Sequence, residues 1–201
     1  STGYSPVMLP GMTPTTVDPA IVAAAANAGH WAELAGGGQH TDGILQENLS
    51  TLSRLLKPGV NAQFNALYLA ASQWRRQIEG PNSILRARAA GAPINGEVIS
   101  AGIPPVEDAV ELVEKLHAAN IPWVAFKPGT SAQVEEVLRV ADALPETTVI
   151  MQLEGSAAGG HHSLEGLDDV LASTYARIRE RDNVLLAVGG GGGRGGRGGR
   201  R

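Results

Sequence analysis

Two adjacent histidines, His161 and His162, stand in a glycine-rich segment that follows the apolar run 149–153. Imidazole changes its protonation state near neutral pH, so a histidine pair at the end of a strand is suited to proton transfer. Gly159 and Gly160 precede the pair and leave room for a flat ligand to lie against the backbone. The segment therefore predicts an active-site loop.

The same histidine pair does not have the spacing of a metal site. Adjacent residues do not share one face of a helix, and neither a cysteine nor an acidic cluster accompanies them. We therefore expect His161 and His162 to serve in catalysis, and we expect no metal.

Composition indicates one domain and excludes several kinds of partner. A chain of 201 residues with 43% hydrophobic residues can bury one sizeable core. Its net charge of −4 gives no general attraction to nucleic acid or anionic lipid, and no apolar run reaches the roughly 18 residues of a membrane span. Without cysteines or an N-terminal signal peptide, the expected location is the cytoplasm, with neither nucleic acid nor a membrane as partner.

Short apolar runs alternate with longer amphipathic segments at the spacing of βα units, which predicts an α/β fold with a parallel sheet. The predicted strands are 7–10, 31–35, 62–67, 97–101, 123–127, 149–153 and 184–188. On this pattern alone the sheet is either a closed (β/α)8 barrel or an open doubly wound sheet. Candidate ligand residues at the ends of many strands favour the (β/α)8 TIM barrel.

The predicted helices have recognisable beginnings. Asp18 can cap a helix with Pro19 at its first position, Thr41 begins a segment that stops before residue 58, and Pro105 precedes a helix over 106–119. Ser131 and Ser163 stand before the last two helices, predicted over 132–144 and 164–181.

Several strand ends together match a known family. The matching segments, in chain order, are 6–16, 32–38, 64–65, 100–104, 126–129 and 159–163. This ordered set resembles the enoyl reductase domain of type I fatty acid synthases of the fungal and actinobacterial megasynthase type, closest to the mycobacterial-like form. The resemblance runs from about residue 5 to about residue 191. Wider relatives with a Gly-Gly-His loop are flavin enzymes such as the nitronate monooxygenases, so a nitronate monooxygenase-like FMN oxidase is the alternative.

The resemblance implies an FMN-binding barrel that uses NADPH to reduce trans-2-enoyl thioesters. It implies as partners an acyl carrier domain that presents the enoyl thioester, and other synthase domains or subunits in a large homo-oligomeric assembly. His161 takes the position of the single histidine of the wider relatives and is the expected proton donor, with His162 in support. FMN rather than FAD is expected, because the first strand lacks a dinucleotide-binding Gly-x-Gly-x-x-Gly turn.

The resemblance also implies which residues bind the cofactor. Thr13 offers a hydroxyl and Asn65 an amide to the flavin heteroatoms, although each also suits a purely structural role. The expected cofactor-binding residues are Gly11, Met12, Thr13, Asn65, Ser100, Gly102, Lys127, Gln152, Gly159, Gly160, Gly189, Gly190 and Gly191.

Lys127 ends an apolar strand and is one of three lysines in the chain. A buried ammonium group requires an anion, which is either the flavin with its phosphate or a carboxylate such as that of Glu154. Gln152 and Glu154 are two residues apart in a predicted strand, so both side chains are expected on the same face.

The C-terminal segment departs from the family. Residues 189–191 resemble the backbone amides that bind the FMN phosphate, but 192–201 is a glycine-arginine run that cannot form a strand. We therefore expect a barrel segment over 1–191 with about seven of the eight strands, and a separate tail over 192–201. The tail is either foreign to the domain or an RNA-binding segment, and the absence of aromatic residues in it favours the first reading.

Overall fold

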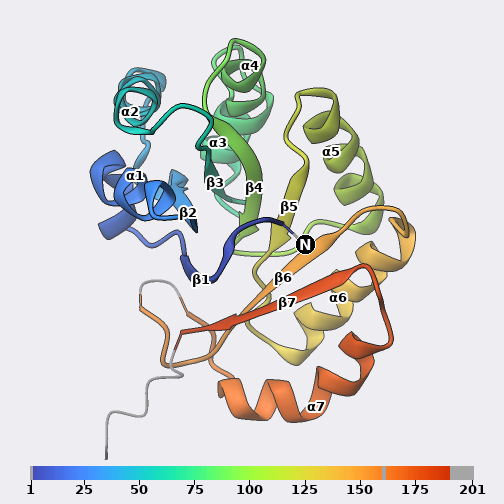
Figure 1. The fold of residues 1–201 in the computed structure, drawn as a ribbon. Coiled ribbons are helices and arrows are strands. Elements are labelled where there is room, and N and C mark those ends of the chain that lie inside the picture. The colour runs from blue at the N-terminus through green and yellow to red at the C-terminus, as the bar shows by residue number, and fades with distance from the viewer. Residues whose placement is uncertain (1, 160–161, 191–201) are drawn as a thin grey trace, which may run out of the picture.

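The computed structural model describes residues 2–159 and 162–190. Its seven strands form one sheet in the order β1 to β7, and every neighbouring pair is parallel. The strands are β1 Ser5–Leu9, β2 His30–Ala35, β3 Ala62–Leu67, β4 Ile94–Ser100, β5 Trp123–Phe126, β6 Val149–Glu154 and β7 Val184–Gly189. The sheet curls into a half-barrel with its helices around the outside (Figure 1). The α/β fold, an incomplete (β/α)8 barrel, is thus confirmed.

Helices connect successive strands. They are α1 Pro19–Asn27, α2 Asp42–Leu55, α3 Ala71–Trp74, α4 Ile84–Ala89, α5 Val106–Ala118, α6 Ser131–Ala143 and α7 Leu167–Arg179. Short turns of helix lie at η1 Thr15–Val17, η2 Gly36–Gly38 and η3 Arg75–Glu79. The described residues include no helix that is long and apolar enough to cross a membrane.

Two predicted helix starts are wrong. The side chain of Thr130, not Ser131, caps α6 by accepting a hydrogen bond from the amide of Gln133. Helix α7 begins at Leu167 rather than at 164, and Ser163 does not cap it. Glu165 explains the late start of α7. Its carboxylate accepts hydrogen bonds from the amide and hydroxyl of Ser131, which hold the chain before α7 as a loop.

Two layers of side chains cover the sheet. Trp31, Val98, Ala125 and Ile150 pack together inside the barrel, whereas the intervening strand residues pack beneath the helices.

Strand β4 begins three residues earlier than predicted because a register shift after Ala62 extends its pairing with β3.

Glu97 is a fully buried acid on the helix-facing side of β4. Neither carboxyl oxygen has a hydrogen-bond partner among the described residues. Burial raises the pKa of Glu97 well above its ordinary value, and the nearby Glu33 raises that pKa further. Below about pH 4 the group is protonated in both the folded and the unfolded chain. As the pH rises, the unfolded chain releases this proton before the folded chain does, so the contribution of Glu97 to stability falls.

Glu97→Gln is therefore expected to raise the melting temperature at pH 8 and to leave it nearly unchanged at pH 4. Each kcal/mol recovered should add roughly 2–4 °C. Melting curves of both proteins across this pH range measure the effect, and Glu111→Gln on the exposed face of α5 is the control. Parallel curves for wild type and Glu97→Gln would show that Glu97 carries no such penalty.

Candidate functional site

A hollow of about 590 Å³ lies at the carboxyl ends of the strands. This end of a barrel carries the catalytic site in almost every known enzyme of this fold. The predicted site residues that line the hollow are Gly11, Met12, Thr13, Asn65, Ser100, Gly102, Lys127, Gly159 and His162. Residues that are far apart in the sequence thus meet around one cavity, whose size is typical of ligand sites.

The other predicted site residues do not line this hollow. Gln152 is buried beneath it. Gly189 ends β7, and Gly190 is so close to the 155–159 loop that a Cβ would lie 2.5 Å from the Cβ of Ala158. Gly160, His161, Gly191 and the 192–201 tail lie outside the described residues.

A fully buried carboxyl group, that of Glu33 in β2, forms the floor of the site. Its Oε1 accepts hydrogen bonds from Gln152 Nε2 at 2.6 Å and from Trp31 Nε1 at 2.9 Å. Its Oε2 accepts from the Gly11 amide at 2.5 Å and from Asn65 Nδ2 at 2.9 Å. One side chain therefore fixes the loop after β1 and strands β2, β3 and β6 in relation to one another.

Glu33 is not among the site residues that the sequence predicts. A signal was present, because an acid in the middle of the apolar run 31–35 must find buried hydrogen-bond donors. Three of the four donors, from Gly11, Asn65 and Gln152, come from distant segments, so the run alone could not identify them.

Asn65 is held on both sides of its amide. Its Oδ1 accepts a hydrogen bond of 2.6 Å from the Ser100 hydroxyl, while its Nδ2 donates to Glu33. An amide has two N–H groups and two lone pairs, so the contacts among the described residues leave one donor and one acceptor position of Asn65 for a ligand in the hollow. The predicted contact of Asn65 with a flavin remains a prediction.

Lys127 pairs with Glu154, with Nζ and Oε1 2.8 Å apart, which is the carboxylate alternative raised by the sequence. Both side chains line the hollow, and they are only 7% and 19% exposed. Lys127 Nζ also donates a 3.4 Å hydrogen bond to the carbonyl oxygen of Gly11.

The shared position of Gln152 and Glu154 on one strand face is confirmed. The Gln152 side chain bonds to Glu33 inside the barrel, and the Glu154 side chain pairs with Lys127.

Glycines let the loops approach one another around the hollow. A Cβ at Gly159 would lie 2.9 Å from Met12 Sδ, and one at Gly37 would lie 2.6 Å from Thr13 Oγ1. A Cβ at Gly129 would lie 2.6 Å from the Cβ of Ser163. The loops that follow β1, β2, β5 and β6 therefore form one closely packed rim.

Gly11→Ala is expected to distort this rim. The added Cβ would lie 2.7 Å from Cβ, Cγ and Nδ2 of Asn65, which the hydrogen bonds to Glu33 and Ser100 hold in place. The variant should lose about 1–3 kcal/mol of unfolding free energy in urea titrations. Gly43→Ala near the start of α2 is the control, because its Cβ would meet only Thr41 Oγ1, at 3.8 Å, and should cost nothing. Equal stability of both variants would contradict the close packing of Gly11 against Asn65.

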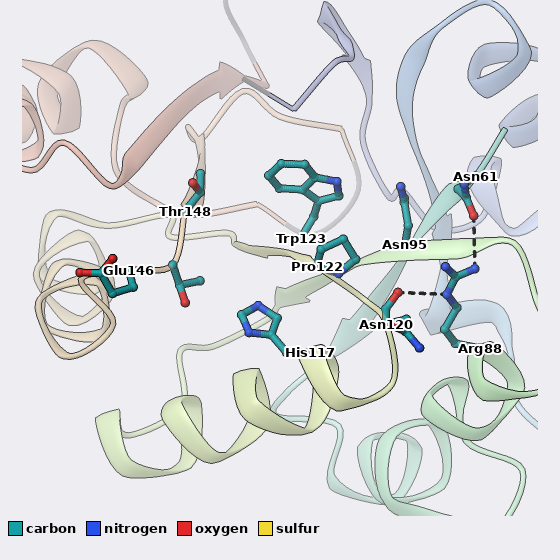
Figure 2. Close-up of a pocket in the computed structure, with 10 residues that line it drawn as sticks. Asn61, Arg88, Asn95, His117, Asn120, Pro122, Trp123, Glu146 and Thr148 are labelled. Carbon is teal, nitrogen blue, oxygen red and sulfur yellow. Dashed lines mark hydrogen bonds between the residues drawn. The ribbon is translucent and has the colours of Figure 1, made fainter. Parts of the chain in front are cut away.

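A separate hollow of about 530 Å³ lies at the opposite end of the strands. Figure 2 shows Arg88 bonded there to Asn61 and Asn120, so the guanidinium joins chain segments. None of the predicted site residues lines this hollow. This end of a barrel ordinarily contributes to stability rather than to catalysis.

Comparison with known proteins connects the chain with fatty acid synthases. Residues 148–198 match a family model described as fatty acid synthase subunit beta/Fas1-like, helical. The fatty acid synthase beta subunit aflB of Emericella nidulans is 37% identical over 191 residues, which is 94% of this chain and 9% of the relative.

The fatty acid synthase beta subunits of Gibberella zeae and Saccharomyces cerevisiae are similar to the same extent. They are 38% identical over 186 residues and 34% identical over 191 residues, which is 92% and 94% of this chain and 9% of each relative. The chain thus spans about a tenth of the length of these relatives. Over almost its whole length, the chain is therefore similar to one region of fungal fatty acid synthase beta subunits.

Proposed function

We propose that this chain provides the enoyl reductase site of a fatty acid synthase, which reduces trans-2-enoyl thioesters with NADPH and FMN. One observation carries the proposal. Most of the site residues predicted from the resemblance to an enoyl reductase line a single hollow at the carboxyl ends of the strands. The similarity of almost the whole chain to fatty acid synthase beta subunits supports a role in fatty acid synthesis.

The hollow suits a flavin mononucleotide in its shape and its polar groups. Glycines at the rim keep side chains away from a flat ring, and within residues 2–159 and 162–190 Asn65 retains one donor and one acceptor position. Bound FMN would supply hydride transfer between NADPH and the β-carbon of the substrate.

The protein's own residues have three tasks in this scheme. Glu33 holds the Gly11 backbone and the Asn65 amide in place, and the Lys127–Glu154 pair forms a charged wall. A histidine of the loop after β6 supplies the proton for the α-carbon. His162 lines the hollow, and His161 is the expected donor.

An acyl carrier domain and further synthase domains in a large assembly are the proposed partners. The cytoplasmic location remains a prediction.

Turnover assays on the full-length protein that contains this chain test the proposal. Crotonyl thioester should be reduced only with NADPH present, and a nitronate should not be oxidised. Oxidation of the nitronate without NADPH, together with no reduction of crotonyl thioester, would instead support the nitronate monooxygenase-like alternative.

A further inference from the structure

A further hollow, of about 720 Å³, opens between helices α3, η3 and α4 on one side and α5 on the other. We call it the α3–α5 groove. Its apolar lining comes from Tyr68, Trp74, Ile78, Leu85 and Leu112. The rings of Tyr68 and Trp74 meet edge to face with their centroids 5.2 Å apart, which gives the groove a rigid aromatic wall.

The groove and the candidate site share one residue, Leu69, which lines both hollows. Leu69 lies two residues after the end of β3 and is 74% exposed. Its backbone amide bonds to the carbonyl of Ala101, and a Cβ at Gly102 would lie 2.8 Å from its Cγ. The groove therefore begins at the rim of the candidate site, with the Leu69 side chain between the two hollows.

From that rim the groove follows α5. Its lining residues on this helix are Asp108, Glu111, Leu112 and Lys115, at the i, i+3, i+4 and i+7 positions that share one helix face. Seven residues at 1.5 Å each give about 10 Å of helix. The groove is thus an elongated channel that leads away from the candidate site.

The charges along the groove balance one another. Three basic side chains, Arg75, Arg86 and Lys115, accompany three acidic ones, Glu79, Asp108 and Glu111. Lys115 and Glu111 form an ion pair of 2.6 Å, so neither attracts an ionic ligand strongly. An apolar channel with balanced charges at its rim fits an uncharged hydrocarbon chain.

We propose that the α3–α5 groove binds the alkyl chain of an acyl thioester whose reactive end lies in the candidate site. This rests on the proposed function for the identity of the thioester. The rival occupant is a segment of a larger synthase. The position of the groove next to the candidate site favours the alkyl chain, because a ligand held at the strand ends need only pass the exposed Leu69 side chain to place its tail in the groove.

Binding of S-alkyl pantetheine thioethers with 4, 8 and 12 carbons to the 201-residue chain tests the proposal by calorimetry. These probes cannot be reduced, so the assay does not depend on a flavin. Affinity should rise with chain length by up to about fourfold for each methylene that enters the groove, which corresponds to about 0.8 kcal/mol per buried CH₂.

Substitutions that fill the groove should abolish this rise. Ala71 is exposed on α3 and lines the groove, so Ala71→Trp should make the 12-carbon probe bind no more tightly than the 4-carbon probe. Ala89→Trp is the control, because Ala89 is also exposed but does not line the groove. Glu111→Trp and Glu114→Trp on α5 form a second pair with the same logic, and thermal melting of all four confirms folding.

A flat chain-length series in the wild-type chain would overturn the proposal, as would equal slopes in the folded Ala71→Trp and Ala89→Trp variants. If Ala71→Trp in the full-length protein impairs subunit assembly and leaves the chain-length dependence intact, the groove belongs to a synthase segment. A slope that Ala71→Trp removes, in a protein that does not reduce enoyl thioesters, would support the alkyl groove and refute only the proposed function.

Discussion

Glu33→Ala is expected to cost about 3–5 kcal/mol of unfolding free energy, because it leaves several buried hydrogen-bond donors without an acceptor. Four donors would lose their shared acceptor: the Gly11 amide, Trp31 Nε1, Asn65 Nδ2 and Gln152 Nε2. A buried donor left without a partner costs about 1–3 kcal/mol, and relaxation or water entry recovers part of the sum. Urea titration of the purified variant measures the loss.

Two further variants separate this effect from a general loss of charge. Glu33→Gln keeps one acceptor oxygen but directs an NH₂ group at the remaining donors, so it should be intermediate in stability. Glu111→Ala removes an exposed acid that is paired with Lys115 and should cost less than about 0.5 kcal/mol. If Glu33→Ala is as stable as Glu111→Ala, the network on the floor of the site does not hold the strands together.

His161→Ala is expected to lower enoyl thioester reduction by the full-length protein by about 10²- to 10⁴-fold, the usual contribution of a general acid. FMN should remain bound, and NADPH should still reduce it, because the loss concerns the proton for the α-carbon. Single-turnover measurements that follow flavin reduction and thioester reduction separately distinguish the two steps.

His162→Ala is the matched comparison from the same loop. His162 lines the hollow, and His161 lies outside the described residues, so the roles rest on the family resemblance. His162→Ala should have a smaller effect than His161→Ala. The opposite order would exchange the two roles, and near wild-type rates for both variants would assign the proton to another group or to water.

The sequence predicted the strands well because each is a short apolar run bounded by Gly, Pro or polar residues. The predicted and observed ranges of β3 are identical, and those of β2 and β6 differ by one residue. Strand alternation likewise placed Gln152 and Glu154 on one face.

Prediction from the local sequence pattern is wrong where contacts with distant residues decide the structure. Ser163 resembles a helix cap, but the hydrogen bonds that Ser131 donates to the Glu165 carboxylate delay the start of α7.

The region between β3 and β4 shows the same limit. No helix was predicted there, yet the chain forms α3, η3 and α4. Buried Gln77 of η3 donates hydrogen bonds to the carbonyl oxygens of Gly36 and Gln39, which lie about forty residues earlier. Such long-range hydrogen bonds leave no periodic signal in the local sequence.

The proposed enoyl reduction requires a mononucleotide flavin in the hollow at the carboxyl ends of the strands. The most direct measurement is to identify the chromophore that heat releases from the full-length protein containing this chain, and to repeat it with Glu33→Ala. We predict FMN from the wild type and a large loss of retained flavin in the variant, whose Gly11 backbone and Asn65 amide lose their anchor. Release of FAD, or the absence of flavin from a correctly folded wild-type protein, would contradict the account.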